Sequence, residues 1–171
     1  MECLDSIMGR RSIRQYTNQP VADGDVELIL RAAMAAPSAG NQQPWRFIVV
    51  TEHAQLEALS HATPYSRMVA SAPLAIVVCG DTRAEKHPGY WVQDCSAAIQ
   101  NALVATNAVG LGAVWIGVHP VEERVANVAR ICSVPEGIVP LAMLSIGHPA
   151  ETKPPAERYE PRFVHHDRWR A

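Results

Sequence analysis

Residues 92–109 limit the choice of fold more than any other segment, because they predict one long helix that has to be buried on several sides. The segment contains neither Pro nor Gly, and its Ala, Ile, Leu and Val residues surround much of the helix instead of forming a single stripe. Gly110 follows as the expected C-terminal cap. In a chain of 171 residues, so much apolar helical surface predicts that a second subunit packs on this helix.

The other predicted elements place a sheet between layers of helices. Apolar spacing predicts helices over residues 5–8, 26–34, 54–61 and 121–132, and apolar or β-branched runs predict strands over 46–51, 73–79, 113–118 and 139–146. Gly80 and Asp81 are expected to end the second strand. This alternation indicates an α+β or α/β domain with three layers. The prolines at 149, 154, 155 and 161 exclude a regular helix, so we expect a single domain over residues 1–171 with an extended tail from about 149.

Charge and composition argue against several functions. The net charge is −2 and the pI is about 6.4, whereas domains that bind nucleic acid are usually basic. No apolar run approaches the roughly 20 residues that span a bilayer, and residues 1–5 lack the pattern of a signal peptide, so we expect a cytoplasmic protein. The four cysteines form no Cys-x-x-Cys pair and the seven histidines no His-x-x-x-His pair, so we expect free thiols and no metal site.

The loop at residues 37–45 has the composition of a surface that faces a ligand. Ser38, Asn41 and Gln43 offer donors and acceptors, as the polar edge of a heterocycle requires, and Gly40 allows the backbone to approach a ring closely. Trp45 is expected to add a flat apolar wall. The alternative is that Ser38 and Asn41 only cap a turn.

A basic cluster near the amino terminus suits a phosphate. In an extended segment, Arg10, Ser12 and Arg14 face one side and Arg11 faces the other. The alternative is a solvated basic surface. A phosphate site together with a site for a planar heterocycle predicts a nucleotide-like cofactor.

Four segments in this order resemble the nitroreductase family of FMN-dependent oxidoreductases. They are Arg10–Tyr16 (RRSIRQY), Ala36–Trp45 (APSAGNQQPW), Gly110–Gly117 (GLGAVWIG), and Lys153–Pro155 together with Arg158. The likeness spans nearly the whole chain. It implies an α+β fold, built as a three-layer α/β/α sandwich around a mixed, mostly antiparallel sheet. It also implies a homodimer with FMN at the interface.

The resemblance implies which residues hold FMN. The phosphate and the polar edge of the flavin fall to Arg10, Arg11, Ser12, Arg14 and Arg158. Ala156 stands where some members have a further lysine, and Arg67 either compensates for that charge or lies on a helix surface. Pro37, Ser38, Ala39 and Asn41 are expected to cover the flavin of the neighbouring subunit.

Backbone groups are expected to complete the flavin site. By resemblance, the N–H groups of Ile116, Gly117 and Val118 reach the N5 and O4 edge of the flavin. Many members have an acidic residue where this chain has Gly117, but a backbone contact survives that change. No catalytic side chain is expected, because the cofactor carries the chemistry.

The implied activity is a ping-pong reaction in which NADH or NADPH delivers hydride to FMN and a nitroaromatic or quinone is then reduced. One alternative is other flavin chemistry of the broader family, namely reductive dehalogenation, dehydrogenation or flavin cleavage. Another is a flavin-binding protein without catalysis. Tyr90 and Trp91 either line the pocket or pack in the core. No residue visibly reads a 2′-phosphate, so the choice between NADH and NADPH stays open.

Overall fold

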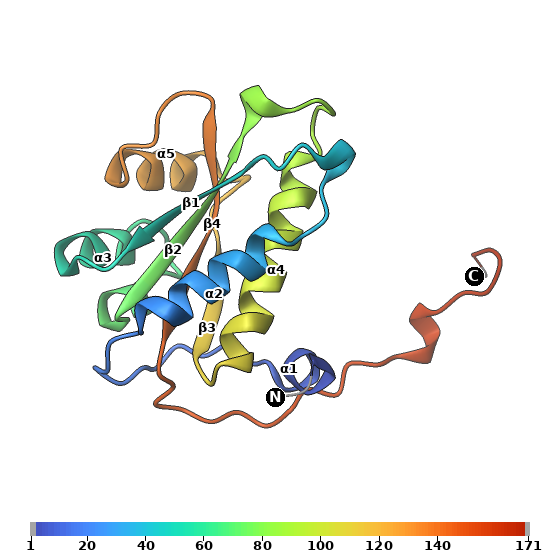
Figure 1. Ribbon diagram of the computed structural model, residues 1–171, viewed down its shortest axis with the longest axis horizontal. Coiled ribbons are helices and arrows are strands. Elements are labelled where there is room, and N and C mark those ends of the chain that lie inside the picture. Colours follow the sequence, from blue (N-terminus) through green and yellow to red (C-terminus); the bar gives the residue numbers. More distant parts are fainter. Residues whose placement is uncertain (1–2, 170–171) are drawn as a thin grey trace.

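The computed structural model describes residues 3–169, which form a sheet with helices on both faces (Figure 1). The helices are α1 (Cys3–Gly9), α2 (Asp23–Met34), α3 (His53–Ser60), α4 (Trp91–Ala108) and α5 (Glu122–Ile131). The strands are β1 (Trp45–Val50), β2 (Leu74–Asp81), β3 (Gly112–Gly117) and β4 (Ile138–Gly147). The chain therefore has the predicted α+β class, and its α-helices and strands begin and end close to the predicted limits.

The four strands pair antiparallel in the order β1-β2-β4-β3. A single parallel bridge, between Ser12 and Ala113, adds the segment after α1 to the outer edge of β3. This bridge gives the sheet its mixed character. It also brings the basic cluster directly beside β3.

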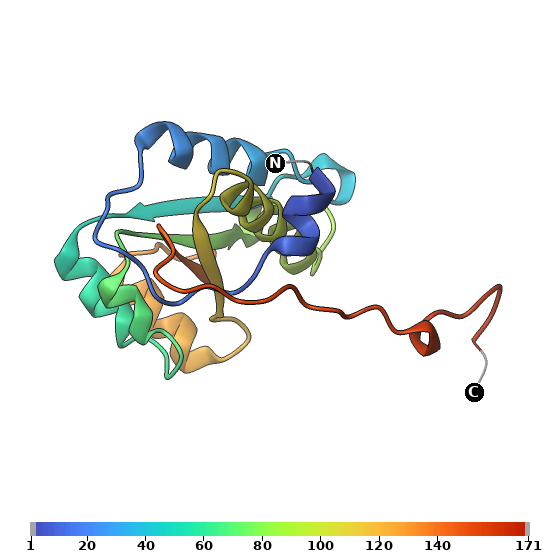
Figure 2. The same cartoon turned by 90° about the horizontal axis from the view of Figure 1, so that it is seen from below.

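Alternation along β2 supplies two separate cores. Leu74, Ile76 and Val78 pack with α2 and α4 on one face of the sheet, and Ala75, Val77 and Cys79 pack with α3 and α5 on the other. All eight residues of the strand are buried, as expected for the centre of a sheet covered on both faces. Figure 2, turned by 90°, shows the sheet between the two helical layers.

The predicted end of β2 was wrong. Gly80 and Asp81 continue the strand and pair with Val139 and Ile138 of β4. A Cβ at Gly80 would lie 2.2 Å from the Trp91 ring, so the absence of a side chain allows α4 to begin directly above the strand. Glycine here permits close packing instead of a turn.

The long helix α4 is the largest helical contribution to the core. Ile99, Ala102 and Leu103 are buried against α2 and the sheet, and Val104 is half-buried on the remaining face. Gly110, at a φ of +80°, follows the helix in the left-handed conformation expected of a C-terminal cap. Within residues 3–169, no helix is long and apolar enough to cross a membrane.

The tail leaves the body of the molecule. Ala150 N–H still donates to Gln15 O (2.9 Å), so the tail first crosses the segment after α1. It then runs into solvent as an extended segment that is interrupted by one 3-10 turn at Pro161–Phe163 (Figures 1 and 2). Tyr159, Phe163 and Trp169 are 81%, 72% and 79% exposed.

Candidate functional site

The basic cluster is held in place by β3 and by the start of the tail. Ile13 N–H donates to Ala113 O (3.0 Å), and the Ile13 side chain is buried against Gly112, where a Cβ would come within 2.8 Å of it. Lys153 Nζ donates to Ser12 O (2.7 Å), and Glu151 Oε1 accepts from Arg14 N–H (2.6 Å). That backbone hydrogen bond is the main cause that lowers the pKa of Glu151.

Arg10, Arg11 and Arg158 form a group of cations without a carboxylate partner. None of the ion pairs within residues 3–169 includes any of them. The Nε atoms of Arg10 and Arg11 are buried and make no hydrogen bond. Burial, and after it the charges of Arg158 and Arg11, lower the pKa of Arg10. Buried donors and mutual repulsion are what a bound anion would relieve.

Arg11 divides its role between this group and the tail. Its Nη1 donates to Pro154 O, so one end of the guanidinium fixes the tail while Nε stays unpaired. Lys153 was expected only as part of the tail motif. Its hydrogen bond to Ser12 O ties the tail to the basic cluster, and this role could not be predicted because the two residues are far apart in sequence.

A cavity of about 480 Å³ lies along β3 and reaches the basic cluster at Arg14. It brings together Arg14, Arg67 and the β3 segment 114–117, and Tyr65 and Met68 complete its wall. Arg67 stands in the first turn of the short helix at Arg67–Ser71 and is exposed, so its side chain lies at the cavity. Two arginines on an otherwise largely apolar wall suit a flat ring with a polar edge.

Trp115 lines the cavity, a place that was not predicted for it. Val114 and Ile116 are buried on the α5 face, so Trp115, 37% exposed, points to the opposite side of β3. The alternation of strand side chains was sufficient to predict this direction. Nothing in the sequence around Tyr65 predicted its place at the cavity.

The ladder between β3 and β4 decides which backbone donors are available. Val118 N–H donates to Leu141 O (3.1 Å), so the sheet already uses this donor. Donors alternate in direction along an antiparallel strand, which turns the Ile116 N–H toward β4 and the Gly117 N–H away from it. Of the three predicted backbone donors, Gly117 is therefore the one that can face a ligand. A Cβ at Gly117 would meet nothing within 4 Å.

These residues fit FMN. Buried, unpaired guanidinium donors at Arg10 and Arg11 match a phosphate, and the neighbouring cavity with Arg14, Arg67 and the Gly117 N–H matches the polar edge of a flavin. The predicted assignment of single residues to single atoms of FMN stays a prediction.

The loop at 37–44 is fixed by a buried amide and a buried carboxylate. Asp94, in the first turns of α4, accepts from Ala39 N–H (2.9 Å) and from Gln42 Nε2 (2.7 Å). Gln42 Oε1 in turn accepts from the N–H groups of Lys86 (2.9 Å) and His87 (3.1 Å). We call Gln42 and Asp94 the loop anchor. Neither was predicted, because the residues they join are far apart in sequence.

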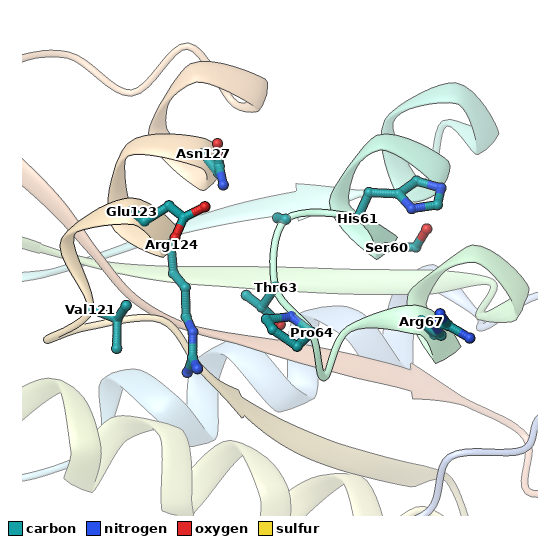
Figure 3. Close-up of a pocket in the computed structure, with 10 residues that line it drawn as sticks. Ser60, His61, Thr63, Pro64, Arg67, Val121, Glu123, Arg124 and Asn127 are labelled. Atoms are coloured by element: carbon teal, nitrogen blue, oxygen red, sulfur yellow. The ribbon is translucent and has the colours of Figure 1, made fainter.

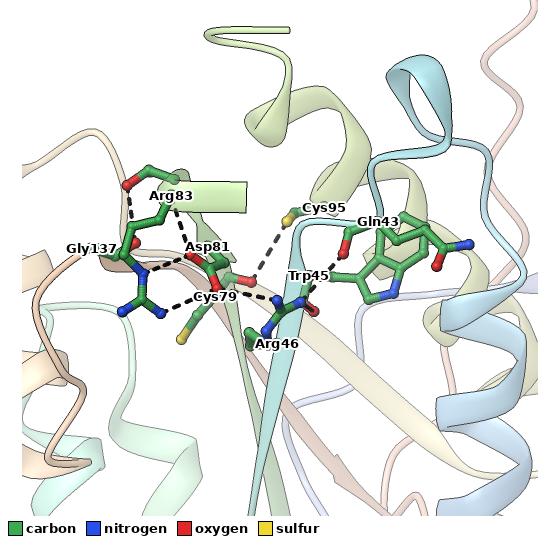
Figure 4. A network of polar contacts seen from close by, with 9 residues as sticks. Gln43, Trp45, Arg46, Cys79, Asp81, Arg83, Cys95 and Gly137 are labelled. Atoms are coloured by element: carbon green, nitrogen blue, oxygen red, sulfur yellow. Dashed lines mark hydrogen bonds and ion pairs between the residues drawn. The ribbon is translucent and has the colours of Figure 1, made fainter. Parts of the chain in front are cut away.

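The other end of the loop is held by a charge network (Figure 4). Asp81 accepts from Arg83 (3.0 Å) and from Arg46 (3.1 Å), and its N–H donates to Pro44 O (2.8 Å). The Arg83 hydrogen bonds lower the pKa of Asp81, against the effect of burial.

Trp45 does not form the predicted wall. It is 6% exposed and packs in the core between the sheet and α4, because its strand position turns the ring inward. Trp91 is also in the core, with its ring 4.9 Å from that of His119. Tyr90 is 49% exposed and lines a shallow cavity with Pro37, Ser38 and Ala39.

Within one chain, the loop and the basic cluster lie at opposite ends of α4. The loop contacts Asp94 at the start of the helix, and Asn107 near its end donates to Ser6 O of α1 (3.1 Å). These two positions are ~20 Å apart along the helix at 1.5 Å per residue. Ser38 also accepts from Gln43 N–H (3.1 Å), and Asn41 from Gln43 Nε2 (3.0 Å), so within the chain both residues cap the turn.

All four cysteines are free. Across the described residues, no group of three or more His, Cys, Asp or Glu side chains is arranged to hold a metal ion.

Comparisons with known proteins agree with this geometry. A sequence model described as "Nitroreductase family" matches residues 7–64 and 54–148. A protein of Methanothermobacter thermautotrophicus named "Putative NADH dehydrogenase/NAD(P)H nitroreductase" is 45% identical, over 99% of this chain and 88% of the relative. A solved structure from Bacteroides thetaiotaomicron with the same name superposes with a TM-score of 0.94 at 40% identity and covers 98% of each chain. A Desulfovibrio desulfuricans protein solved in complex with FMN has a TM-score of 0.85 at 32% identity and covers 99% of each chain.

Proposed function

The chain belongs to the nitroreductase family, and from this premise we propose that it is an FMN-dependent oxidoreductase. It takes hydride from NADH or NADPH and reduces a flat, electron-poor acceptor of the nitroaromatic or quinone type. Names of relatives with NAD(P)H nitroreductase in them, and a similar protein solved with FMN, support the donor and the cofactor. A cytoplasmic location would agree with the use of NAD(P)H.

One observation carries the proposal. Arg10 and Arg11, with buried unpaired Nε atoms, belong to the same segment as Arg14, which together with Arg67 and the exposed end of β3 lines a cavity of about 480 Å³. Phosphate-binding cations next to a mostly apolar slot are the requirement of a flavin mononucleotide.

The chain binds and orients the cofactor, and no side chain is proposed as an acid or base; the protons that the acceptor takes up would come from water. When bound, FMN supplies the hydride chemistry. Arg10 and Arg158 would hold its phosphate, and Arg14 and Arg67 would place positive charge beside the ring. The Gly117 N–H offers a fixed donor that does not titrate, which favours negative charge without reorganisation.

We infer a ping-pong order, because the donor and the acceptor would both have to approach the same face of the flavin. Trp115 and Tyr65 are exposed apolar surfaces at this cavity, on which a nicotinamide and an aromatic acceptor can each stack. The donor must leave before the acceptor enters.

A homodimer completes the proposed site. The loop that is expected to cover FMN lies ~20 Å along α4 from the basic cluster of the same chain, so a second copy has to supply one of the two. Leu4 and Met8 of α1 are 72% and 68% exposed, and the tail presents three exposed aromatic rings, so a large apolar surface is available for association.

Absorbance and reduction measurements test the function. We expect the purified protein to be yellow, to release FMN identified by mass spectrometry, and to be bleached by NADH or NADPH without oxygen. A subsequent panel of nitroaromatics and quinones should restore the colour. A colourless protein that does not bind added FMN at micromolar concentration would contradict the proposal.

A further inference from the structure

A second cavity of about 490 Å³ lies between α3 and α5 (Figure 3). We call it the α3–α5 cleft. It shares Pro64 and Arg67 with the cavity proposed for the flavin, so the two cavities adjoin along this segment. Apart from Arg67, no residue that lines the cleft has a role in the function proposed above.

The cleft has an excess of positive charge. Arg67 and Arg124 stand on opposite sides of Pro64 (Figure 3), whereas His61 at the end of α3 is paired with Glu57 (3.2 Å). No ion pair among the described residues includes Arg67 or Arg124, although the chain as a whole is acidic. Glu123 is the one carboxylate in the lining, and Asn127 adds an amide.

Arg124 is pre-oriented toward the edge of the flavin cavity. Its guanidinium carbon lies 5.3 Å from the centre of the Tyr65 ring, and Nη1 lies 3.5 Å from Gly117 O. Both of these partners also line the flavin cavity. Gly117 has no side chain to shield this edge, so the charge of Arg124 reaches a ligand that lies there. Stacking on Tyr65 fixes the guanidinium without neutralising it.

We propose that the α3–α5 cleft binds an oxyanion of the molecule that exchanges hydride in the adjoining cavity. The oxyanion is either a phosphate of the nicotinamide donor or a carboxylate of the acceptor. A guanidinium with a fixed orientation and free donors binds both groups. Arg124 is thus a specificity-determining residue. This inference rests on the proposed flavin function, because that function places a ligand next to the cleft.

Matched substrates distinguish the two sources. NADH is compared with 1-benzyl-1,4-dihydronicotinamide, a hydride donor without phosphate, and 4-nitrobenzoate with the neutral 4-nitrobenzamide. In Arg124→Gln we expect the KM ratio of the charged to the neutral compound to rise about tenfold for one pair, equivalent to about 1.4 kcal/mol. A rise in the donor pair assigns the cleft to the donor phosphate, and a rise in the acceptor pair assigns it to a carboxylate. Arg124→Lys keeps the charge but loses the planar fork that stacks on Tyr65, so its ratio should lie between those of the wild type and of Arg124→Gln.

Arg130→Gln is the matched control, since Arg130 is exposed on the same helix and does not line the cleft. Unchanged ratios for both pairs in a folded, FMN-loaded Arg124→Gln protein would overturn the inference.

A binding measurement separates failure of this inference from failure of the flavin function. Pyrophosphate is titrated calorimetrically into the wild type, Arg124→Gln and Glu123→Gln. We expect about tenfold weaker binding for Arg124→Gln and tighter binding for Glu123→Gln, which removes the opposing carboxylate. Equal affinities in all three proteins would contradict the cleft assignment even if FMN is bound and reduced. A protein that shows the expected affinities but no flavin would contradict the proposed function alone.

Discussion

At the scale of single residues, the molecule is distinguished by arginines that have no carboxylate to pair with. Arg10, Arg11 and Arg158 gather at one point, and burial lowers the pKa of Arg10. Such a group is costly in the free protein, because desolvated like charges repel. It becomes favourable when an anion binds, so we expect the affinity for FMN to depend strongly on these side chains.

Arg10→Ala should weaken FMN binding at least tenfold. A hydrogen bond to a charged group contributes roughly 1.5–3 kcal/mol, and about 1.4 kcal/mol corresponds to a factor of ten. Fluorescence titration of the flavin measures the dissociation constant. Arg31→Ala is the control, because Arg31 pairs with Glu27 on the surface of α2. An unchanged constant in a folded Arg10→Ala protein would return Arg10 to a solvated surface residue.

Cys79 and Cys95 should resist thiol reagents in the folded protein. Burial raises the pKa of each to about 12, so at pH 8 about one thiol in ten thousand is ionised. Cys3 is exposed and should react first. The pKa is higher in the folded than in the unfolded state, so this contribution to stability is complete below about pH 9 and is lost as the pH rises toward 12. Mass spectrometry after timed labelling checks the order, and rapid native labelling of Cys79 would contradict it.

At the scale of elements, the loop anchor connects the 37–44 loop, the 85–87 segment and α4 through four hydrogen bonds. Gln42 and Asp94 are 8% and 5% exposed, so loss of a partner leaves a buried polar group unsatisfied. Each of these bonds has a defined donor and acceptor. Exchanging the amide and the carboxylate between positions 42 and 94 therefore tests the arrangement.

Asp94→Asn and Gln42→Glu should each reduce the free energy of unfolding by roughly 1–3 kcal/mol. The first sets two amide donors face to face, and the second sets two carboxylates face to face. The double variant should recover to within about 1 kcal/mol of the wild type, because the new amide at position 94 can donate to the new carboxylate at position 42 while all four bonds persist. Urea unfolding measures the stability, and FMN affinity should follow the same order. Additive losses in the double variant would show that the anchor does not work in this way.

The spacing of apolar residues predicted the helices and strands. The features that it did not predict depend on contacts between residues far apart in sequence. The apolar run at 73–79 and the long helix at 92–109 carry their own signals, so both were placed within about two residues. The basic cluster could also be recognised, because its arginines are close together in the sequence. The loop anchor was not, because Gln42 and Asp94 are 52 positions apart. The loss of Val118 as a donor was equally hidden, since the register of β3 on β4 decides it.

At the scale of the whole molecule, the two groups proposed to hold one flavin lie at the two ends of α4. A chain that binds FMN with both therefore has to combine its own basic cluster with the loop of a partner. Each dimer would then contain two composite sites, and each site would depend on both sequences.

Mixed dimers of Arg10→Ala and Asn41→Gly should recover about a quarter of the wild-type activity. Asn41 has a φ of +54°, which glycine adopts without strain, so the variant removes the side chain and keeps the loop. In a heterodimer one site carries both changes and the other carries neither, and half the dimers of a random mixture are heterodimers. Steady-state assays after co-refolding of the two inactive proteins measure the recovery. Verified heterodimers without recovery, or a fully active monomer in sedimentation, would show that each chain builds its own site.

In the proposed dimer, the helix α4 would act as a rigid spacer. It fixes the loop at one end and α1 at the other, so its number of turns would set the distance between the two flavin sites of the proposed dimer. Four residues inserted into it would displace one end by ~6 Å and misalign both centres at once. The same insertion in the distal tail, beyond the contacts of Lys153 and Pro154, would move neither. Evolution and engineering could therefore lengthen this protein at its distal tail, whereas the proposed dimer requires α4 to keep its length.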